Sequence, residues 1–188
     1  AEYRANGINP FGGPFYDIEK ICDIREKELP ADEGAIGPEA VAAGRMVAKR
    51  GMGKSIFADL RDSTGKLQLF ASKSELSEAD FALFKKLDIG DIIGIEGSVF
   101  KTKTGEISIH AEKIVLLSKS LLPLPEKYHG LKDEDTRYRQ REVDLIANPD
   151  VKKTFVMRSK ILSAIRSYLD GVGYLEVDTP VLQPLEIG

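Results

Sequence analysis

The sequence predicts a mainly β protein with some α-helix, built around a five-stranded barrel. Apolar and polar residues alternate with a period of two in five segments between residues 40 and 117. A helical stretch separates the third segment from the fourth, and glycine-containing turns join the neighbouring segments. Helical patterns also precede and follow this region, so we expect an N-terminal helix before the barrel and an α+β region after it.

The order of the predicted elements identifies the type of barrel. The expected strands cover residues 40–49, 55–61, 66–72, 92–101 and 106–117. Asp62-Ser63-Thr64-Gly65 and Lys103-Thr104-Gly105 are short polar turns of the kind that hairpins use. Residues 74–87 have apolar side chains at helical spacing, and Ser74 is the expected N-cap. Three strands, a helix and two strands is the order of an oligonucleotide/oligosaccharide-binding (OB) barrel.

The regions outside the barrel give the expected domain limits. Residues 17–28 form a predicted packing helix, and Leu-Pro-Leu-Pro at 122–125 marks an ordered linker. Two further helices are expected at 133–146 and 150–169, followed by a short strand at 174–177. The predicted parts are an N-terminal helical segment (1–34), the barrel domain (35–118), a linker (119–132) and the start of a second domain (133–188).

Composition limits the possible functions. The 188-residue chain has a net charge of −3 and a pI near 5.6, so any contact with RNA has to be local. One cysteine and two histidines do not favour a disulfide framework or a zinc cluster, and no metal site is predicted. The sequence lacks an apolar run of the ~18 residues that a membrane span needs, which predicts a cytoplasmic protein without membrane contact.

Two tempting sites do not fit the pattern of a catalytic centre. Gly53-Lys54-Ser55 resembles the end of a phosphate-binding P-loop, but the earlier glycine falls at Ala48 and the segment leads into a strand. No nucleophile and base are paired around His110 or His129, so no catalytic residue is predicted.

One face of the barrel has the residue types that bind RNA bases. Because alternate side chains point to opposite faces, Phe57 is expected on the outer face, with Gln68 as its diagonal neighbour across the next strand. An aromatic ring offers a stacking platform worth ~1–3 kcal/mol per base, and a carboxamide can bind a base edge. Arg50 and Glu106 are expected to add polar contacts. The expected phosphate contacts are Arg45, Lys54, Lys101 and Lys103.

Simpler explanations exist for the same residues. Phe57 could be a barrel-end residue covered by the N-terminal helix, and Phe70, which shares its outward parity, could be the covered residue instead. Taken singly, Gln68 and Glu106 fit ordinary polar surface positions.

Longer stretches of the sequence resemble the class II lysyl-tRNA synthetases over essentially the whole chain. These stretches are Asn9-Pro10-Phe11, residues 43–60, Asp62-Ser63-Thr64-Gly65, Gln68-Leu69, Gly90-Asp91-Ile92-Ile93-Gly94, residues 102–106, the linker 122–130, and Arg137-Tyr138-Arg139-Gln140-Arg141. The resemblance implies that Phe57 stacks on a base of the uridine-rich lysine anticodon and that Arg50, Gln68 and Glu106 contact base edges.

The resemblance also implies roles for the residues after the linker. Residues 155–165 and 173–180 resemble motif 1 of class II synthetases, which forms the homodimer interface of the complete enzyme. The implied interface residues are Phe155, Arg158, Ile161, Ile165 and Pro180. Glu142 stands where the family usually has an aromatic residue, which affects the expected packing of that helix.

The resemblance implies that the complete enzyme uses ATP and Mg²⁺ to attach lysine to tRNA(Lys). The family's motifs 2 and 3, which bind ATP, follow motif 1 and do not occur in the 188 residues. The expectation is therefore that this chain binds tRNA without charging it and holds no cofactor itself.

Four alternatives remain open. An aspartyl- or asparaginyl-tRNA synthetase fragment would share the barrel, although the linker and Tyr138-Arg139-Gln140-Arg141 resemble the lysyl type more. The barrel could instead bind single-stranded nucleic acid without sequence preference. It could also pack on a partner in a dimerisation fragment, or belong to a synthetase-like region fused to a lipid-modifying membrane protein.

Overall fold

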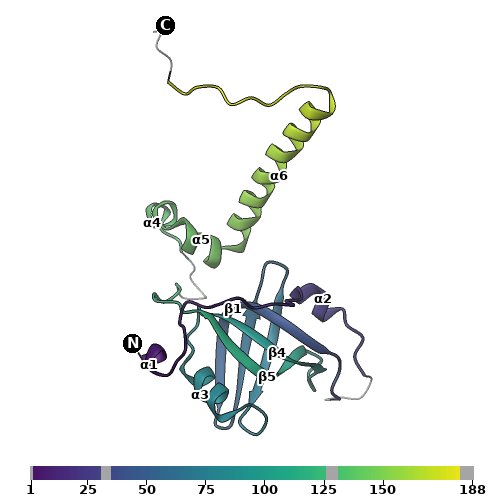
Figure 1. Ribbon diagram of the computed structural model, residues 1–188, viewed down its shortest axis with the longest axis vertical. Helices are drawn as coiled ribbons and strands as arrows, with labels where there is room; N and C mark the ends of the chain where they lie inside the picture. Colours follow the sequence, from purple (N-terminus) through teal and green to yellow (C-terminus); the bar gives the residue numbers. More distant parts are fainter. Residues whose placement is uncertain (1, 31–34, 126–130, 183–188) are drawn as a thin grey trace. The chain divides into compact units, whose positions relative to one another are not determined.

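The computed structural model describes residues 2–30, 35–125 and 131–182, and it separates the chain into two compact units, Ala1–Pro123 and Leu124–Gly188. The first unit contains a closed barrel and the second contains helices (Figure 1). The predicted mainly β fold with an OB-like barrel and following helices is confirmed. The finer domain limits at residues 35–118 and 119–132 stay predictions.

The barrel closes through five strands in the spatial order β1-β2-β3-β5-β4. The strands are β1 (Glu39–Met52), β2 (Ser55–Arg61), β3 (Lys66–Ser72), β4 (Ile92–Lys101) and β5 (Ile107–Ser118). Strand β1 pairs with β4 along its first half and with β2 along its second half, with a bulge between Met46 and Ala48. This long, bent strand and the parallel β3–β5 pairing close the sheet, so the barrel has no free edge among these strands.

The alternation seen in the sequence places one set of side chains inside the barrel. In β2 and β3 the inward residues are Ile56, Ala58, Leu60, Leu67, Leu69 and Ala71, each at most 4% exposed. Their neighbours along the strands therefore point outward, as the two-residue period requires.

Helix α3 (Glu78–Lys86) lies at one end of the barrel (Figure 1) and contributes Phe81, Leu83 and Phe84 to the core. The prediction of Ser74 as N-cap is wrong. Ser77 caps the helix by accepting a 3.0 Å hydrogen bond from the Asp80 N–H, whereas the Ser74 hydroxyl bonds the Ser72 hydroxyl. At the other end of the helix, the Lys49 ammonium donates to three backbone carbonyls, and burial lowers its pKa.

The N-terminal segment contains two short helices, α1 (Glu2–Ala5) and α2 (Ile21–Arg25). The predicted helix over residues 17–28 is therefore too long. Asp17 has a φ of 58°, and the Glu19 N–H bonds the Val41 carbonyl, so the chain before α2 follows β1 instead of forming helix. Only Ile21 and Ile24 of α2 enter the core.

Asp62 fastens α2 to the turn between β2 and β3. Its carboxylate accepts hydrogen bonds from the backbone N–H groups of Ile21, Thr64 and Gly65 and from the Thr64 hydroxyl. Burial alone would raise the pKa of Asp62, but these hydrogen bonds, led by that from Ile21, outweigh it and hold the pKa below its ordinary value.

The second unit contains α4 (Glu134–Arg139), α5 (Arg141–Ala147) and α6 (Pro149–Gly171). The helix predicted over 133–146 is broken at Gln140, whose φ and ψ are −118° and 59°. The buried carboxylate of Asp144 holds the two pieces together by accepting hydrogen bonds from Arg137, Arg141 and Asn148. The Asn148 hydrogen bond is the largest cause of the lowered pKa of Asp144, followed by opposing desolvation and the two arginines.

The predicted strand at residues 174–177 does not form. Within residues 131–182 the structure describes no strand that could pair with it, and an extended segment needs ladder hydrogen bonds to become a strand. Of the helices in the described ranges, none combines the length and the apolar character of a membrane span.

The role of Asp62 predicts a pH-dependent loss of stability. Replacing Asp62 by Ala leaves the Ile21 and Gly65 N–H groups without their acceptor, so we expect the free energy of unfolding to fall by about 1–3 kcal/mol at pH 7. Because the folded-state pKa lies below 3.8, the contribution is present above that value and is lost as the pH falls through the folded pKa. Urea unfolding at pH 7 and below pH 3.8 measures both effects.

The exposed neighbour Ser63 supplies the control. Ser63→Ala should unfold like the parent chain at each pH. A difference between Asp62→Ala and the parent that stays constant down to the lowest pH would contradict the linkage.

Candidate nucleic-acid interface

Aromatic side chains from four neighbouring strands form one surface on the outside of the barrel. Phe57 on β2 is paired in register with Phe70 on β3, and Phe70 is paired with His110 on β5. Phe100 lies on β4, where it is paired with Ser108, two residue pairs beyond the Ser98–His110 pair. We call these four residues, Phe57, Phe70, His110 and Phe100, the aromatic surface.

The rings of the aromatic surface contact one another. The Phe57 and Phe70 centroids lie 4.9 Å apart, and Phe70 stacks on His110 at 5.2 Å. Phe100 meets Phe70 and His110 edge-on, at 6.2 and 5.8 Å. All four side chains are half-buried, so each presents part of its ring to solvent. Stacked and edge-on pairs of this kind hold rings in fixed positions on a strand surface.

Phe57 lies on β2, away from the β2–β3 turn to which the N-terminal helix α2 is bound. The hydrogen bonds of α2 go to Asp62, Thr64 and Lys66 at the β2–β3 turn. The partner that the structure gives the Phe57 ring is Phe70, which has the same outward parity.

Gln68 lies on the same face, directly across from Asp59 on β2, as the sequence predicts. On its other side it is paired with Ser108 of β5, and the Ser108 hydroxyl donates a 3.0 Å hydrogen bond to Gln68 Oε1. Gln68 is thus fixed between two strands, next to the aromatic surface. The remaining polar group of its amide, the NH₂, is available for other partners.

A buried carboxylate organises the basic residues next to Phe57. Asp59 is 4% exposed, and its carboxylate lies 3.2 Å from Lys66 Nζ and 3.6 Å from Arg50 Nη2. Arg50 is paired in register with Phe57 and is itself exposed. Asp59 therefore holds the Arg50 guanidinium near the Phe57 ring. The other N–H groups of Arg50 remain able to bind an anion or a base.

The two loops beside this face carry the other predicted residues. Lys54 is exposed in the β1–β2 turn, and Lys101 and Lys103 are exposed around the β4–β5 turn. Glu106 precedes β5, where its N–H bonds the Thr102 hydroxyl and its side chain is half-buried. In OB folds the loops between strands 1 and 2 and between strands 4 and 5 flank the ligand-binding face.

Arg45 is placed differently from the lysines. It lies on β1 opposite Arg61 and Ile92, and its Nη1 donates a 2.8 Å hydrogen bond to the Gly90 carbonyl. The structure thus gives Arg45 a role in joining β1 to the turn before β4, apart from the Phe57 neighbourhood.

Sequence reasoning missed three members of this face: Ser108, Phe100 and His110 as an aromatic partner. His110 Nε2 also contacts the carboxylate of Glu75, in the segment between β3 and α3. Ser108 and His110 alternate with the same parity as Glu106, and this pattern in the sequence indicates that they share its outer face. Their contacts with β3 depend on the parallel β3–β5 pairing, which alternation within one strand does not reveal.

Comparison with known proteins agrees with this geometry. Residues 40–117 match the family of OB-fold nucleic acid binding domains, and residues 133–188 match the class II tRNA synthetases of the D, K and N type. Lysine–tRNA ligase of Moorella thermoacetica is 51% identical over 182 residues, 97% of this chain and 36% of that protein. The enzymes of Pelotomaculum thermopropionicum and Bacillus subtilis are each 48% identical over the whole chain, which covers 36% and 38% of their lengths.

Along its whole length the chain is similar to lysine–tRNA ligases.

The similarity also bears on the alternatives. The matched class II family includes the D and N types, but the similar curated proteins are lysine–tRNA ligases at 46–51% identity, which favours the lysyl type. The chain spans somewhat more than a third of the length of these relatives.

The residues predicted for a dimer interface lie in the second unit. Phe155, Arg158, Ile161 and Ile165 are all exposed on α6, and Pro180 is exposed beyond it. Phe155, Ile161 and Ile165 are 41–52% exposed, which leaves an apolar stripe on the helix. At its beginning, the Arg141 guanidinium lies over the Phe155 and Tyr138 rings, at 5.1 and 5.0 Å. Glu142 itself is exposed.

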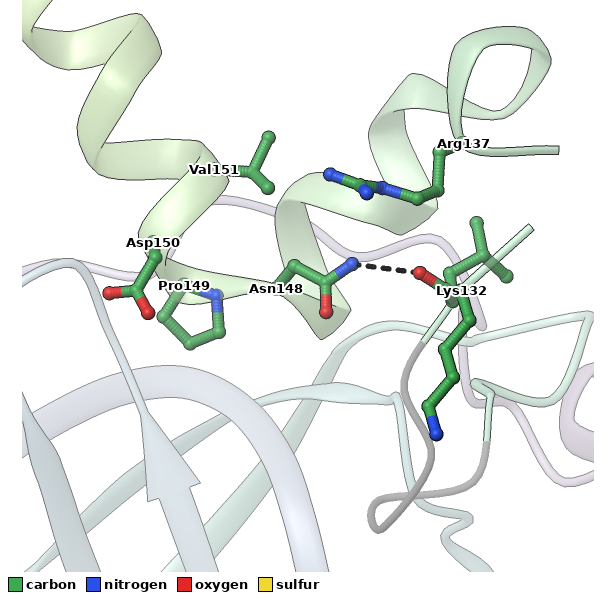
Figure 2. Close-up of a pocket in the computed structure, with 7 residues that line it drawn as sticks. Lys132, Arg137, Asn148, Pro149, Asp150 and Val151 are labelled. Carbon is green, nitrogen blue, oxygen red and sulfur yellow. Dashed lines mark hydrogen bonds between the residues drawn. The ribbon is translucent and has the colours of Figure 1, made fainter. Parts of the chain in front are cut away.

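An open depression of about 460 Å³ lies where α6 begins (Figure 2). It is lined by Leu131, Lys132, Arg137, Asn148, Pro149, Asp150 and Val151. The Asn148 amide crosses it to donate to the Leu131 carbonyl, and Arg137 is engaged with Asp144. Asn148 and Arg137 thus use polar groups of the depression within the unit.

The contact between Phe57 and Phe70 predicts a measurable coupling. In a double-mutant cycle of Phe57→Leu and Phe70→Leu, we expect a coupling free energy of about 0.5–1.5 kcal/mol. Either single substitution already removes the contact between the two rings, so the second substitution cannot remove it again. Urea unfolding of the four chains measures it.

Phe57→Leu and Tyr16→Leu provide the matched control, because Tyr16 is an exposed ring of the N-terminal segment, outside the aromatic surface. These substitutions should add to within about 0.5 kcal/mol. Equal coupling in both pairs would show that the contact is not specific.

Proposed function

We propose that the whole protein is a lysine–tRNA ligase, which attaches lysine to tRNA(Lys) with ATP, and that the barrel of this chain binds the anticodon. The observation that supports this most is the aromatic surface with Gln68 and Arg50 beside it, on a barrel that matches the OB-fold nucleic acid binding domains. The relatives at 46–51% identity are lysine–tRNA ligases. We also propose that the protein acts in the cytoplasm.

Each residue of the face has a proposed role. Phe57 offers its half-exposed ring for stacking on an anticodon base, and Arg50 and Gln68 donate hydrogen bonds to base edges. Glu106 accepts a hydrogen bond from a base imino or amino group. The exposed lysines at positions 54, 101 and 103 attract the RNA phosphates from the flanking loops. Arg45, which is bonded to Gly90, is the weakest of the predicted phosphate contacts.

ATP and Mg²⁺ are proposed only for the whole protein. Among residues 2–30, 35–125 and 131–182, no group of three His, Cys, Asp or Glu side chains is arranged to hold a metal ion.

The second unit is proposed to mediate dimerisation of the whole protein through α6. Its exposed apolar stripe, which includes Phe155, Ile161 and Ile165, fits a helix whose partner is another protein surface. Arg158 lies on the same exposed helix, and Pro180 follows it.

Binding to a lysine anticodon stem-loop tests the proposed function of the barrel. The parent chain should bind the uridine-containing loop more tightly than a loop in which adenosine replaces the uridines. Phe57→Ala should weaken binding by about 1–3 kcal/mol, because one stacking platform is lost. Fluorescence anisotropy at fixed salt measures both comparisons.

Tyr16→Ala is the control, since Tyr16 is an exposed aromatic residue of the N-terminal segment. It should leave the affinity unchanged. Equal affinity for uridine and adenosine loops would favour a barrel that binds single strands without sequence preference. Full affinity in Phe57→Ala would favour a barrel that only packs on a protein partner.

Salt dependence tests the lysines of the flanking loops. Each lysine that neutralises a phosphate contributes about 0.7 to the slope of log K against log salt for a single strand. We therefore expect Lys54→Ala and Lys103→Ala each to reduce the slope by about that amount while preserving the preference for uridine.

Lys113 is the matched control, because it is a β5 lysine already paired with Glu96 at 2.6 Å. Lys113→Ala should keep the parent slope. The phosphate assignment would be wrong if all three variants had the same slope as the parent chain.

A further inference from the structure

Ser108 is a buried polar residue whose hydrogen bond goes to the proposed base-binding amide. Its side chain is fully buried on β5, and a buried hydroxyl requires a hydrogen-bond partner. A hydroxyl has one proton to donate, and Ser108 donates it to Gln68 Oε1 at 3.0 Å. The parallel register, which pairs Ser108 with Gln68, sets this contact.

The surroundings of Gln68 select one orientation of its amide. A carboxamide has an accepting oxygen and a donating NH₂ group, and a half-turn exchanges them. The Ser108 hydroxyl attracts the oxygen toward β5. The residue across on β2 is Asp59, whose negative carboxylate repels the amide oxygen and attracts the NH₂ group. Asp59 is paired with Lys66 and Arg50, and its Oδ1 is buried without a hydrogen-bond partner among the described residues, so an amide oxygen turned toward it would face a second acceptor.

We propose that Ser108 is a positioning residue that fixes the Gln68 amide with its NH₂ group toward the RNA, so that this group selects a carbonyl oxygen on the base. The inference rests on the proposed binding of the anticodon by this face. Uracil presents carbonyl oxygens at C2 and C4, whereas cytosine has an amino group at C4. A fixed donor therefore forms a hydrogen bond with uracil O4 and faces another donor in cytosine. If the amide were free to turn, its oxygen could accept from the cytosine amino group, and the discrimination would fall.

The test measures discrimination as well as affinity. Dissociation constants are measured for the parent chain and for Ser108→Ala, with a lysine anticodon stem-loop and with loops in which each anticodon uridine in turn is replaced by cytidine. At the position that contacts Gln68, Ser108→Ala should reduce the cytidine-to-uridine ratio of dissociation constants about three- to tenfold. Gln68→Met should remove the same preference, and adding Ser108→Ala to it should change the ratio no further.

Ser98→Ala is the matched control. Ser98 is also a buried serine of the barrel, 4% exposed on β4, but its hydroxyl donates to Glu112 at 3.2 Å. It should lower stability without changing the ratio. If Ser108→Ala does not fold, Ser108→Cys, which keeps the size and only a weak donor, takes its place with the same expected direction.

The outcomes separate this inference from the proposed function. If the parent chain discriminates but Ser108→Ala or Ser108→Cys keeps the full ratio, Ser108 only fills space and the positioning role is wrong. If the parent chain shows no preference at any position, the proposed anticodon recognition itself fails. A ratio lowered equally by Ser98→Ala would also overturn the specific role of Ser108.

Discussion

The parallel pairing of β3 with β5 is the constraint on which the proposed interface depends. It consists of three residue pairs, Gln68–Ser108, Leu69–Ile109 and Phe70–His110, between segments 40 positions apart in the chain. The middle pair points inward, and both of its side chains are 1% exposed in the core. The two outer pairs point outward and bring the amide, the buried hydroxyl and two rings together. Burial of Leu69 and Ile109 thus fixes the register of the groups that face solvent.

Charge is distributed so that an acidic chain can still offer a basic surface. Several carboxylates are used inside the fold. Asp91 is fully buried and accepts hydrogen bonds from Lys119 and from the Ser120 N–H, next to the turn before β4. Burial opposes the charge of Lys119, but hydrogen bonds with Asp88 and Asp91 prevail and raise its pKa. The net charge of −3 therefore says little about the field beside Phe57, where Arg50 and the loop lysines are exposed.

The sequence predicted the strand limits that depend on local pattern. It missed the features that depend on contacts with other segments of the chain. Strands β2, β3 and β4 have the predicted limits, because alternation and turn residues act within one hairpin. Asp17 interrupts a segment with helical spacing, and the Glu19 N–H bonds the Val41 carbonyl there, whereas Gln140 has non-helical φ and ψ between α4 and α5. Residues 174–177 had strand propensity but no described partner strand.

The same distinction applies to the candidate site. Alternation placed Phe57 and Gln68 on one face, and the register agrees. The roles of Ser108 and Phe100 could not be foreseen, because they require knowing which strand lies beside β3 in the closed barrel. Sequence resemblance indicated a similarity to anticodon-binding proteins. Hydrogen bonds such as that from Ser108 to Gln68 are revealed only by the three-dimensional structure.

The central claim is that nucleobases lie against the outer face formed by β2, β3 and β5. Photocrosslinking tests it most directly, with 4-thiouridine replacing the uridines of a lysine anticodon stem-loop and with the attached peptides identified by mass spectrometry. We expect crosslinks to residues 55–61, 66–72 and 107–110, which contain Phe57, Gln68 and His110. Crosslinks found in α6 or in the N-terminal segment, with none on these strands, would contradict it.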